Sequence, residues 1–193
     1  MSITNDIEGI KSVNIKSTDI KRRLLMSSNM VKIFQSFLKE SIGNEVIVIN
    51  TNIGMEVYYY SSNDYSIFIK DSVILYTLKH INPAKLKFKC YLRREEVHQS
   101  FCEALFTFSQ YPQIFLAYAK KFIRLIDINE DSRFVMPILN NFFEDTLQLL
   151  KETGKVPHYE KIQNEKNKSQ KSDLNQKMID NLISEILLKK HRN

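Results

Sequence analysis

The chain has 193 residues, of which 43% are hydrophobic and 26% are charged, a composition that can supply the buried core of one domain. With only four glycines and four prolines, collagen-like and linker-dominated proteins are excluded. The net charge of +6 permits contact with nucleic acid or acidic protein surfaces but does not require it.

The cysteines and the N-terminal residues give an indication of the cellular compartment of the protein. Cys90 and Cys102 are too few for a disulfide framework in a chain of this length, and neither belongs to a CxxC pair, so we expect both to be reduced and largely buried. The first residues lack the basic and apolar regions of a signal peptide, and no window approaches the ~20 apolar residues of a membrane span. We therefore expect a soluble, cytoplasmic protein.

Residues 1–27 are predicted to be an N-terminal arm. The isoleucines of residues 3–20 are spaced irregularly and fit neither the period of a strand nor that of a helix. A helix is predicted from about Ser28, because Ser28 or Asn29 can cap it and apolar side chains then recur at spacings of three and four. Gly43 lies just past the last of these side chains, where a left-handed helix end is usual.

The stretch between residues 46 and 92 is predicted to form a mostly antiparallel sheet of four or five strands. Short segments rich in β-branched and aromatic residues alternate there with turn residues, which is typical of hairpins. The predicted strands are residues 46–50, 55–60, 65–70 and 86–92. Residues 73–81 fit either a short helix or a strand, and we favour a strand because Val, Ile, Tyr and Thr are frequent there.

Three helices are predicted after the sheet. The first begins near Arg94 and has one apolar face, formed by Val97, Phe101, Ala104, Leu105 and Phe108. Pro112 suits the first turn of the second helix, which runs to about residue 126. The third helix covers residues 132–152, and Gly154 ends it.

Beyond these helices the chain becomes polar. Residues 155–172 contain few apolar side chains and are predicted to form a flexible linker. Residues 173–193 then show an amphipathic stripe, so we predict a C-terminal helix that must place its apolar face on some surface. The residues of this stripe are Leu174, Met178, Ile179, Leu182, Ile183, Ile186 and Leu187. The surface can belong to the same chain, to a second copy of the chain or to a groove in a protein partner.

Together these elements predict an α+β protein. Its globular domain, residues 28–154, consists of an N-terminal helix, the mostly antiparallel sheet of four or five strands and a helical layer that covers one face of the sheet. The tethered C-terminal amphipathic helix extends this domain.

A basic sheet face is a candidate nucleic-acid site. The lysines of residues 85–90 alternate with apolar residues, so a strand would direct three amines to one side. The predicted phosphate contacts are Lys85, Lys87, Lys89, Arg93 and Arg94. Tyrosines such as Tyr58 and Tyr60 would then stack on bases. The same lysines also suit an edge strand, where charge prevents pairing with another sheet.

The sequence contains no catalytic, cofactor or metal signature. The four histidines are scattered, and there is no glycine-rich phosphate loop and no Gly-x-Ser-x-Gly turn. We therefore expect no cofactor, and an enzyme has no support. Our leading hypothesis is a non-catalytic adaptor or regulatory protein that acts through protein–protein contacts, with the C-terminal helix as its docking or self-association element. The alternative is a nucleic-acid-binding factor.

Overall fold

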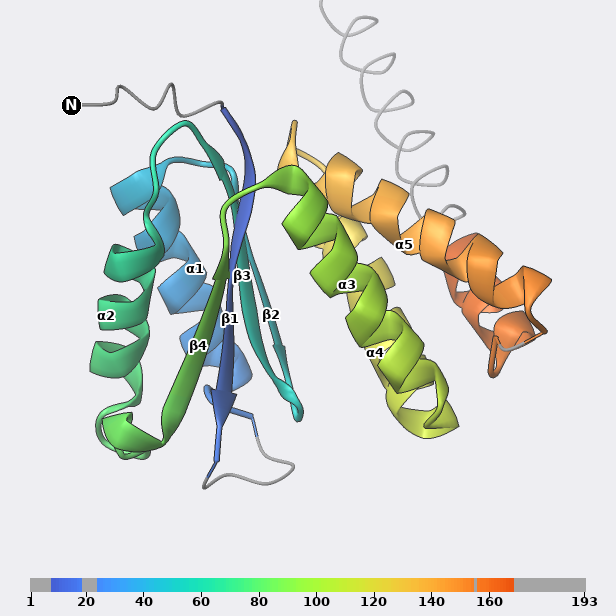
Figure 1. Cartoon of the computed structure of the whole chain (residues 1–193), viewed down its shortest axis with the longest axis horizontal. Helices are drawn as coiled ribbons and strands as arrows, with labels where there is room; N and C mark the ends of the chain where they lie inside the picture. Colours follow the sequence, from blue (N-terminus) through green and yellow to red (C-terminus); the bar gives the residue numbers. More distant parts are fainter. Residues whose placement is uncertain (1–7, 19–23, 155, 169–193) are drawn as a thin grey trace, which may run out of the picture.

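The computed structural model describes residues 8–18, 24–154 and 156–168, which are arranged in three layers (Figure 1). The middle layer is a sheet of β1 (Gly9–Ser17), β2 (Val46–Thr51), β3 (Gly54–Ser61) and β4 (Leu86–Tyr91). On one face of the sheet lie α1 (Ser28–Ile42) and α2 (Ser66–Thr77). On the other face lie α3 (Arg94–Ser109), α4 (Pro112–Ile128) and α5 (Val135–Glu152). A short 3-10 turn, η1 (Pro83–Lys85), leads into β4.

The sheet has the strand order β2-β3-β1-β4, and every neighbouring pair is antiparallel. Because α1 joins β1 to β2 and α2 joins β3 to β4, the first half of the chain has the βαββαβ connectivity of the split βαβ, or ferredoxin-like, motif. The predicted α+β class, with a four-stranded antiparallel sheet followed by a helical layer, is confirmed. Helices cover both faces of this sheet, whereas the sequence predicted cover on one.

Strand β1 shows that the prediction of an N-terminal arm is wrong for residues 9–17. This strand lies inside the sheet, paired with β3 on one side and β4 on the other. Val13 and Ile15 belong to the core beside α1 and α2, and the residues that alternate with them face α3. The faces alternate along the whole strand, but the apolar positions change face: Ile10 packs in the core beside α3, on the same side as Ser12 and Asn14, and Lys11 is on the side of Val13 and Ile15. This change hides the strand period of the hydrophobic residues in the sequence.

Residues 65–70 and 73–81 were both predicted as strands, and this is wrong because most of them form helix α2. Ile69 and Val73, four positions apart, are fully buried on its inner face. The outer face is also apolar, since Leu75 is 67% exposed. A helix that is apolar on both faces lacks a clear helical period in its hydrophobic residues. Its β-branched residues then favour the prediction of a strand.

The remaining predicted elements are confirmed within a few residues. Strands β2, β3 and β4 match the strands predicted at 46–50, 55–60 and 86–92, and α3, α4 and α5 match the three later helices. Helix α1 is capped by Ser27, whose side chain accepts the backbone N–H of Met30. Gly43 ends α1 with φ of 116°, and Pro112 is the first residue of α4.

The predicted linker is helical in part. Residues 159–168 form helical turns, and Ile162 is fully buried in the core shared by α3, α4 and α5. Lys166 Nζ lies 2.5 and 2.7 Å from the two carboxylate oxygens of Glu144 on α5. One buried isoleucine and a few ion pairs thus hold this segment against the helical layer, although its polar composition predicted a flexible linker.

Glu45 connects the sheet to the helical layer that follows it. Its carboxylate accepts the Ser132 hydroxyl at 2.8 Å and the backbone N–H groups of residues 133–135 at 2.8 to 3.1 Å. These donors form the start of α5, where a negative charge is stabilised by the helix dipole. Burial raises the pKa of Glu45, but the four hydrogen bonds outweigh it and hold the pKa below its ordinary value of 4.5.

Two expectations about the compartment can be compared with the structure. Among the residues that the structure describes, no helix is long and apolar enough to cross a membrane. Cys90 and Cys102 are free thiols, and both are half-buried rather than largely buried.

Candidate functional site

Three rows of side chains cross the sheet on the face toward α3. In the order β2-β3-β1-β4, the first row is Ile47, Tyr58, Ser12 and Tyr91, and the second row is Ile49, Glu56, Asn14 and Lys89. The third row consists of Thr51, Gly54, Lys16 and Lys87. Side chains therefore become more polar from the first row to the third.

A cavity of about 560 Å³ lies over the second and third rows, between the sheet and α3. Ser100, Glu103 and Thr107 of α3 line its wall, together with Tyr118 of α4. Gly54 lines the opposite side, where a Cβ atom would lie only 2.6 Å from the backbone oxygen of Ile15. The volume falls in the range of about 300–1,000 Å³ that is usual for small-molecule sites.

Glu56 is one of two carboxyl groups that line this cavity, and it lies on the sheet side. The Tyr118 hydroxyl donates a hydrogen bond to Glu56 Oε2 at 3.2 Å, and Tyr58 also hydrogen-bonds the carboxyl group. Burial raises the pKa of Glu56 to about 7, although the two tyrosines and the nearby Lys16 lower it. This carboxyl group therefore changes its charge near neutral pH, which is a property of many binding and catalytic sites.

Asn14 lies beside Glu56 and is only partly satisfied. Its Nδ2 donates to the Ser100 hydroxyl at 3.2 Å, while no described protein group hydrogen-bonds its Oδ1. The hydroxyl of Ser12, one row away, is also buried without a described partner. Buried polar atoms without partners are uncommon in folded proteins, so the cavity has hydrogen-bonding capacity that the chain itself does not use.

Three lysines line the cavity, and two of them were predicted site residues. Lys87 and Lys89 are exposed on the α3 side of β4, as their alternation predicted, and Lys16 of β1 is opposite Lys87. Lys16 was not among the predicted site residues, because the sequence pattern of β1 did not indicate a strand. Lys89 Nζ lies 4.9 Å from the centre of the Tyr91 ring. Lys85 is in η1, before the strand begins, and does not line the cavity.

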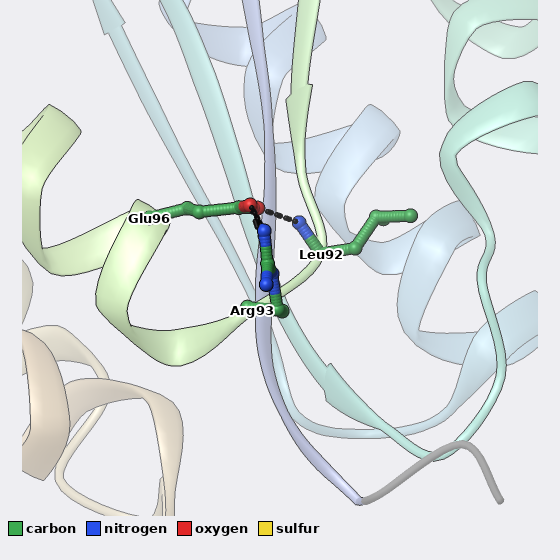
Figure 2. A network of polar contacts seen from close by, with 3 residues as sticks. All are labelled: Leu92, Arg93 and Glu96. Atoms are coloured by element: carbon green, nitrogen blue, oxygen red, sulfur yellow. Dashed lines mark hydrogen bonds and ion pairs between the residues drawn. The ribbon is translucent and has the colours of Figure 1, made fainter. Parts of the chain in front are cut away.

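Arg93 and Arg94 lie past the opposite end of β4 and do not join the lysines. Figure 2 shows Glu96 accepting hydrogen bonds from Arg93 Nε at 2.9 Å and from the backbone N–H of Leu92 at 3.3 Å. These hydrogen bonds cap the N-terminus of α3, so Arg93 and Glu96 have a structural role there. The Arg94 guanidinium lies 5.8 Å from the centre of the Phe142 ring.

The tyrosines expected to stack on bases are not available for that role. Tyr58 is only 1% exposed and packs against Phe101 in the core. Tyr60 is stacked on Phe134, with ring centres 4.5 Å apart. Helices α3 to α5 cover the central strands, so the prediction of an open aromatic sheet face is wrong.

A second concave region, which we call the hairpin groove, lies between the β2–β3 hairpin and the first half of α4. Its volume is about 700 Å³. Apolar side chains that are 37% to 56% exposed line it, and these are Leu24, Ile53, Tyr111 and Ile114. Tyr118 lines both the hairpin groove and the cavity, so the two sites are adjacent.

Polar contacts close the edge of β2 beside the hairpin groove. Lys121 Nζ donates to the backbone oxygen of Asn50, and burial lowers the pKa of this amine. Gln35 Oε1 accepts the backbone N–H of Val48 at 2.9 Å. Because these side chains occupy backbone groups along the edge, the hairpin groove offers its apolar side chains rather than an open strand edge.

The predicted partner-binding residues, from Leu174 to Leu187, lie outside the described residues. In the part of the chain that is described, no three histidine, cysteine or acidic side chains are grouped to hold a metal ion. Chemically, the described surface offers a polar cavity with three amines at one side and, next to it, an apolar groove. No family model, curated protein or solved structure matches this chain.

Proposed function

We propose that the protein is a non-catalytic adaptor or regulatory protein that works through protein–protein contacts, and that the hairpin groove is its docking surface. The observation that supports this most directly is the exposed apolar lining of the groove, formed by Leu24, Ile53, Tyr111 and Ile114. Grooves of this kind receive the apolar face of an amphipathic helix. Such a helix is predicted in this chain at residues 174–187.

The occupant that we propose is this C-terminal segment of the same chain. Glu165, near the end of the described residues, lies 3.8 Å from both Lys120 and Arg124 of α4. The chain therefore leaves the described region beside the helix whose residues 113–121 line the groove. From residue 168, the last one described, the chain needs six residues to reach Leu174, and these can span up to roughly 20 Å. This distance exceeds the ~10 Å diameter of a helix, so the link is long enough to pass around α4.

Tethering gives this docking a regulatory consequence. A short link raises the effective concentration of the segment at the groove to about the millimolar range. The segment then covers the apolar groove in the free protein, and a partner that supplies a more strongly binding amphipathic helix replaces it. The released segment becomes available at the same time, so one exchange binds a partner at the groove and frees the segment for a second contact.

Binding of a fluorescent peptide of residues 170–193 to the full chain tests this proposal. In a variant with Leu182→Asp and Ile186→Asp, the segment no longer covers the groove, so this variant should bind the peptide about tenfold or more tightly than the unaltered chain. Adding Ile114→Glu should abolish binding, because it places a charge in the groove. Fluorescence anisotropy measures each affinity.

Ile128→Glu is the matched control for Ile114→Glu. Ile128 is on the same helix and 72% exposed, but it does not line the groove, so this change should leave peptide binding intact. Equal binding by the unaltered chain and the double variant would contradict coverage by the segment. Absence of binding by the double variant would contradict the groove as a docking surface.

A further inference from the structure

We propose that the cavity between the sheet and α3 binds a small molecule that carries a phosphate group, held by Lys16, Lys87 and Lys89. This goes beyond the docking function of the hairpin groove and is carried by different residues. It rests on the register of the strands, the volume of the cavity and the Asn14 Oδ1 atom, which has no described hydrogen-bond partner there.

The register brings positive charges together. Lys16 and Lys87 are direct cross-strand partners, and Lys89 is paired with Asn14 one position along on the same face. Directly opposed like charges on neighbouring strands destabilise a sheet. An arrangement that lowers the stability of the free protein is explained if an anion binds between these amines.

The negative charges near the lysines do not fully compensate them. Glu103 lines the cavity and interacts with Lys89, but one of its oxygens also accepts Gln99 Nε2 at 2.8 Å. Glu56 attracts Lys16 and is only partly ionised at neutral pH. Within the described residues, no carboxylate lies within ion-pair distance of Lys87, which leaves its amine available for a phosphate.

The cavity also has room and chemistry for the rest of the molecule. It is about 560 Å³ in volume and extends from the lysines to Tyr118. Asn14 offers one polar atom without a described partner, and Glu56 can accept or donate a hydrogen bond according to its protonation. A ring with several hydrogen-bonding groups, attached to the phosphate, fits this combination better than a purely apolar group.

A small molecule fits these observations better than a nucleic-acid strand. A protein that binds a single nucleic-acid strand needs an extended basic groove with aromatic side chains exposed for stacking on the bases. Here Tyr58 and Tyr60 are engaged in packing, Arg93 is engaged with Glu96, and the lysines border a cavity of limited volume. A small phosphate-bearing molecule and a nucleic-acid strand both carry phosphate groups, so the experiment must distinguish binding of one from binding of the other.

Calorimetric titration of the full chain with pyrophosphate, and with the four nucleoside 5′-monophosphates and their nucleosides, tests the proposal at about 50 mM salt, where phosphate contacts are strong. Pyrophosphate should bind saturably with a dissociation constant below about 1 mM. Any nucleotide that binds should do so about tenfold or more tightly than its nucleoside, because the nucleoside lacks the phosphate.

Matched variants locate the site. Lys16→Gln with Lys87→Gln should weaken pyrophosphate binding about tenfold or more. Lys32→Gln with Lys79→Gln removes the same charge from exposed positions on the α1 and α2 side and should leave binding unchanged. Thermal unfolding of each variant shows that the fold is retained, since all four lysines are on the surface.

Three results would overturn the proposal. One is the absence of saturable pyrophosphate binding up to about 10 mM, a concentration at which even weak anion sites fill. Another is equal weakening by the two pairs of substitutions. The third is tight binding of single-stranded RNA that depends on Lys16 and Lys87 while pyrophosphate and the mononucleotides do not bind, which would assign the lysines to nucleic acid.

Discussion

On the sheet face toward α1 and α2, the central strands bury Val13, Ile15 and Val57, each at most 1% exposed, whereas the same strands place Asn14 and Glu56 on the opposite face. Helices cover both faces, but the cavity on the α3 side leaves Asn14 and Glu56 half-buried and the lysines beside them exposed. The first face is mostly apolar and closely packed, and its buried polar side chains Lys11 and Asn50 each donate a hydrogen bond to a backbone oxygen. The second face holds a carboxyl group, an amide and opposed lysines whose pairing within the chain is incomplete.

The difference between the two faces separates stability from function. Residues on the α1 and α2 side should matter chiefly for folding, because most of them are apolar and pack against other core residues. Residues around the cavity should matter less for folding, and some should lower stability, because their polar groups are desolvated without full compensation. Substitutions confined to one face, and at the Glu45 contact between the sheet and α5, test this difference.

The largest expected effect comes from exchanging the character of two adjacent residues on β1. Val13→Asn should lower the free energy of unfolding by about 3 kcal/mol, because it buries an amide in an apolar core. Asn14→Val should change it by less than about 1 kcal/mol, because Asn14 is already only partly hydrogen-bonded. Urea unfolding followed by circular dichroism measures both. Similar losses for the two variants would contradict the distinction between the faces.

The next effect concerns Glu45, a carboxylate with a full set of donors. Glu45→Gln should lower the free energy of unfolding by about 1–2 kcal/mol at neutral pH, because charge-assisted hydrogen bonds at the start of α5 are lost. The folded pKa of Glu45 is below the ordinary value of 4.5, so its contribution is present above that value and is lost as the pH falls through the folded pKa. The difference between variant and unaltered protein should therefore vanish in acid.

Glu40→Gln is the control for the Glu45 prediction. Glu40 is exposed on α1, so its neutralisation should change unfolding only slightly at any pH. If Glu45→Gln proves as stable as Glu40→Gln at neutral pH, the carboxylate does not hold the start of α5.

Glu56 should behave in the opposite way. Its folded pKa, about 7, is above the ordinary value of 4.5, so the folded protein retains a proton that the unfolded chain has released, and stability falls as the pH rises between these values. Glu56→Gln should remove this fall and give a gain of about 1–2 kcal/mol above neutral pH, a figure reduced for solvent in the cavity. The charged and titratable groups that line the cavity with it are Lys16, Lys87, Lys89, Tyr91, Glu103 and Tyr118. Thermal unfolding across a pH series provides the measurement, and a loss of stability above neutral pH would be the contrary result.

The smallest effect should come from the opposed lysines. Lys16→Gln with Lys87→Gln should raise the free energy of unfolding by about 0.5 kcal/mol at low ionic strength, because cross-strand repulsion is removed. At about 1 M salt, where the screening length is about 3 Å, this gain should disappear. Urea unfolding at the two salt concentrations tests this. A gain that does not depend on salt would have a cause other than repulsion.

Elements whose apolar residues follow one clear pattern were predictable from the sequence. The alternation of lysine and apolar residues in β4 and the spaced aromatic residues of α3 indicate these elements directly. Strand β1 was missed because its apolar residues change from one face, at Ile10, to the other, at Val13 and Ile15. Helix α2 was missed because its apolar residues surround it.

The cavity could not be predicted from local patterns. Glu56 is beside Asn14 only because β1 pairs with β3, and it meets Tyr118 from 62 positions later in the chain. No periodicity within one segment reports a contact between three elements. The basic residues were visible in the sequence, but only the register of β1 and β4 shows that Lys16 completes the group with Lys87 and Lys89.

The central claim is that lysines on the α3 side of the sheet bind a phosphate and lower the stability of the protein when no phosphate is bound. One comparison tests this claim most directly. The free energy of unfolding is measured for the unaltered chain and for Lys16→Gln with Lys87→Gln, each with and without about 10 mM pyrophosphate, because a ligand stabilises the state that binds it. The account predicts that the variant is the more stable of the two without pyrophosphate and that pyrophosphate stabilises only the unaltered chain. A variant that is less stable without pyrophosphate, or that gains as much from it as the unaltered chain does, would contradict the account.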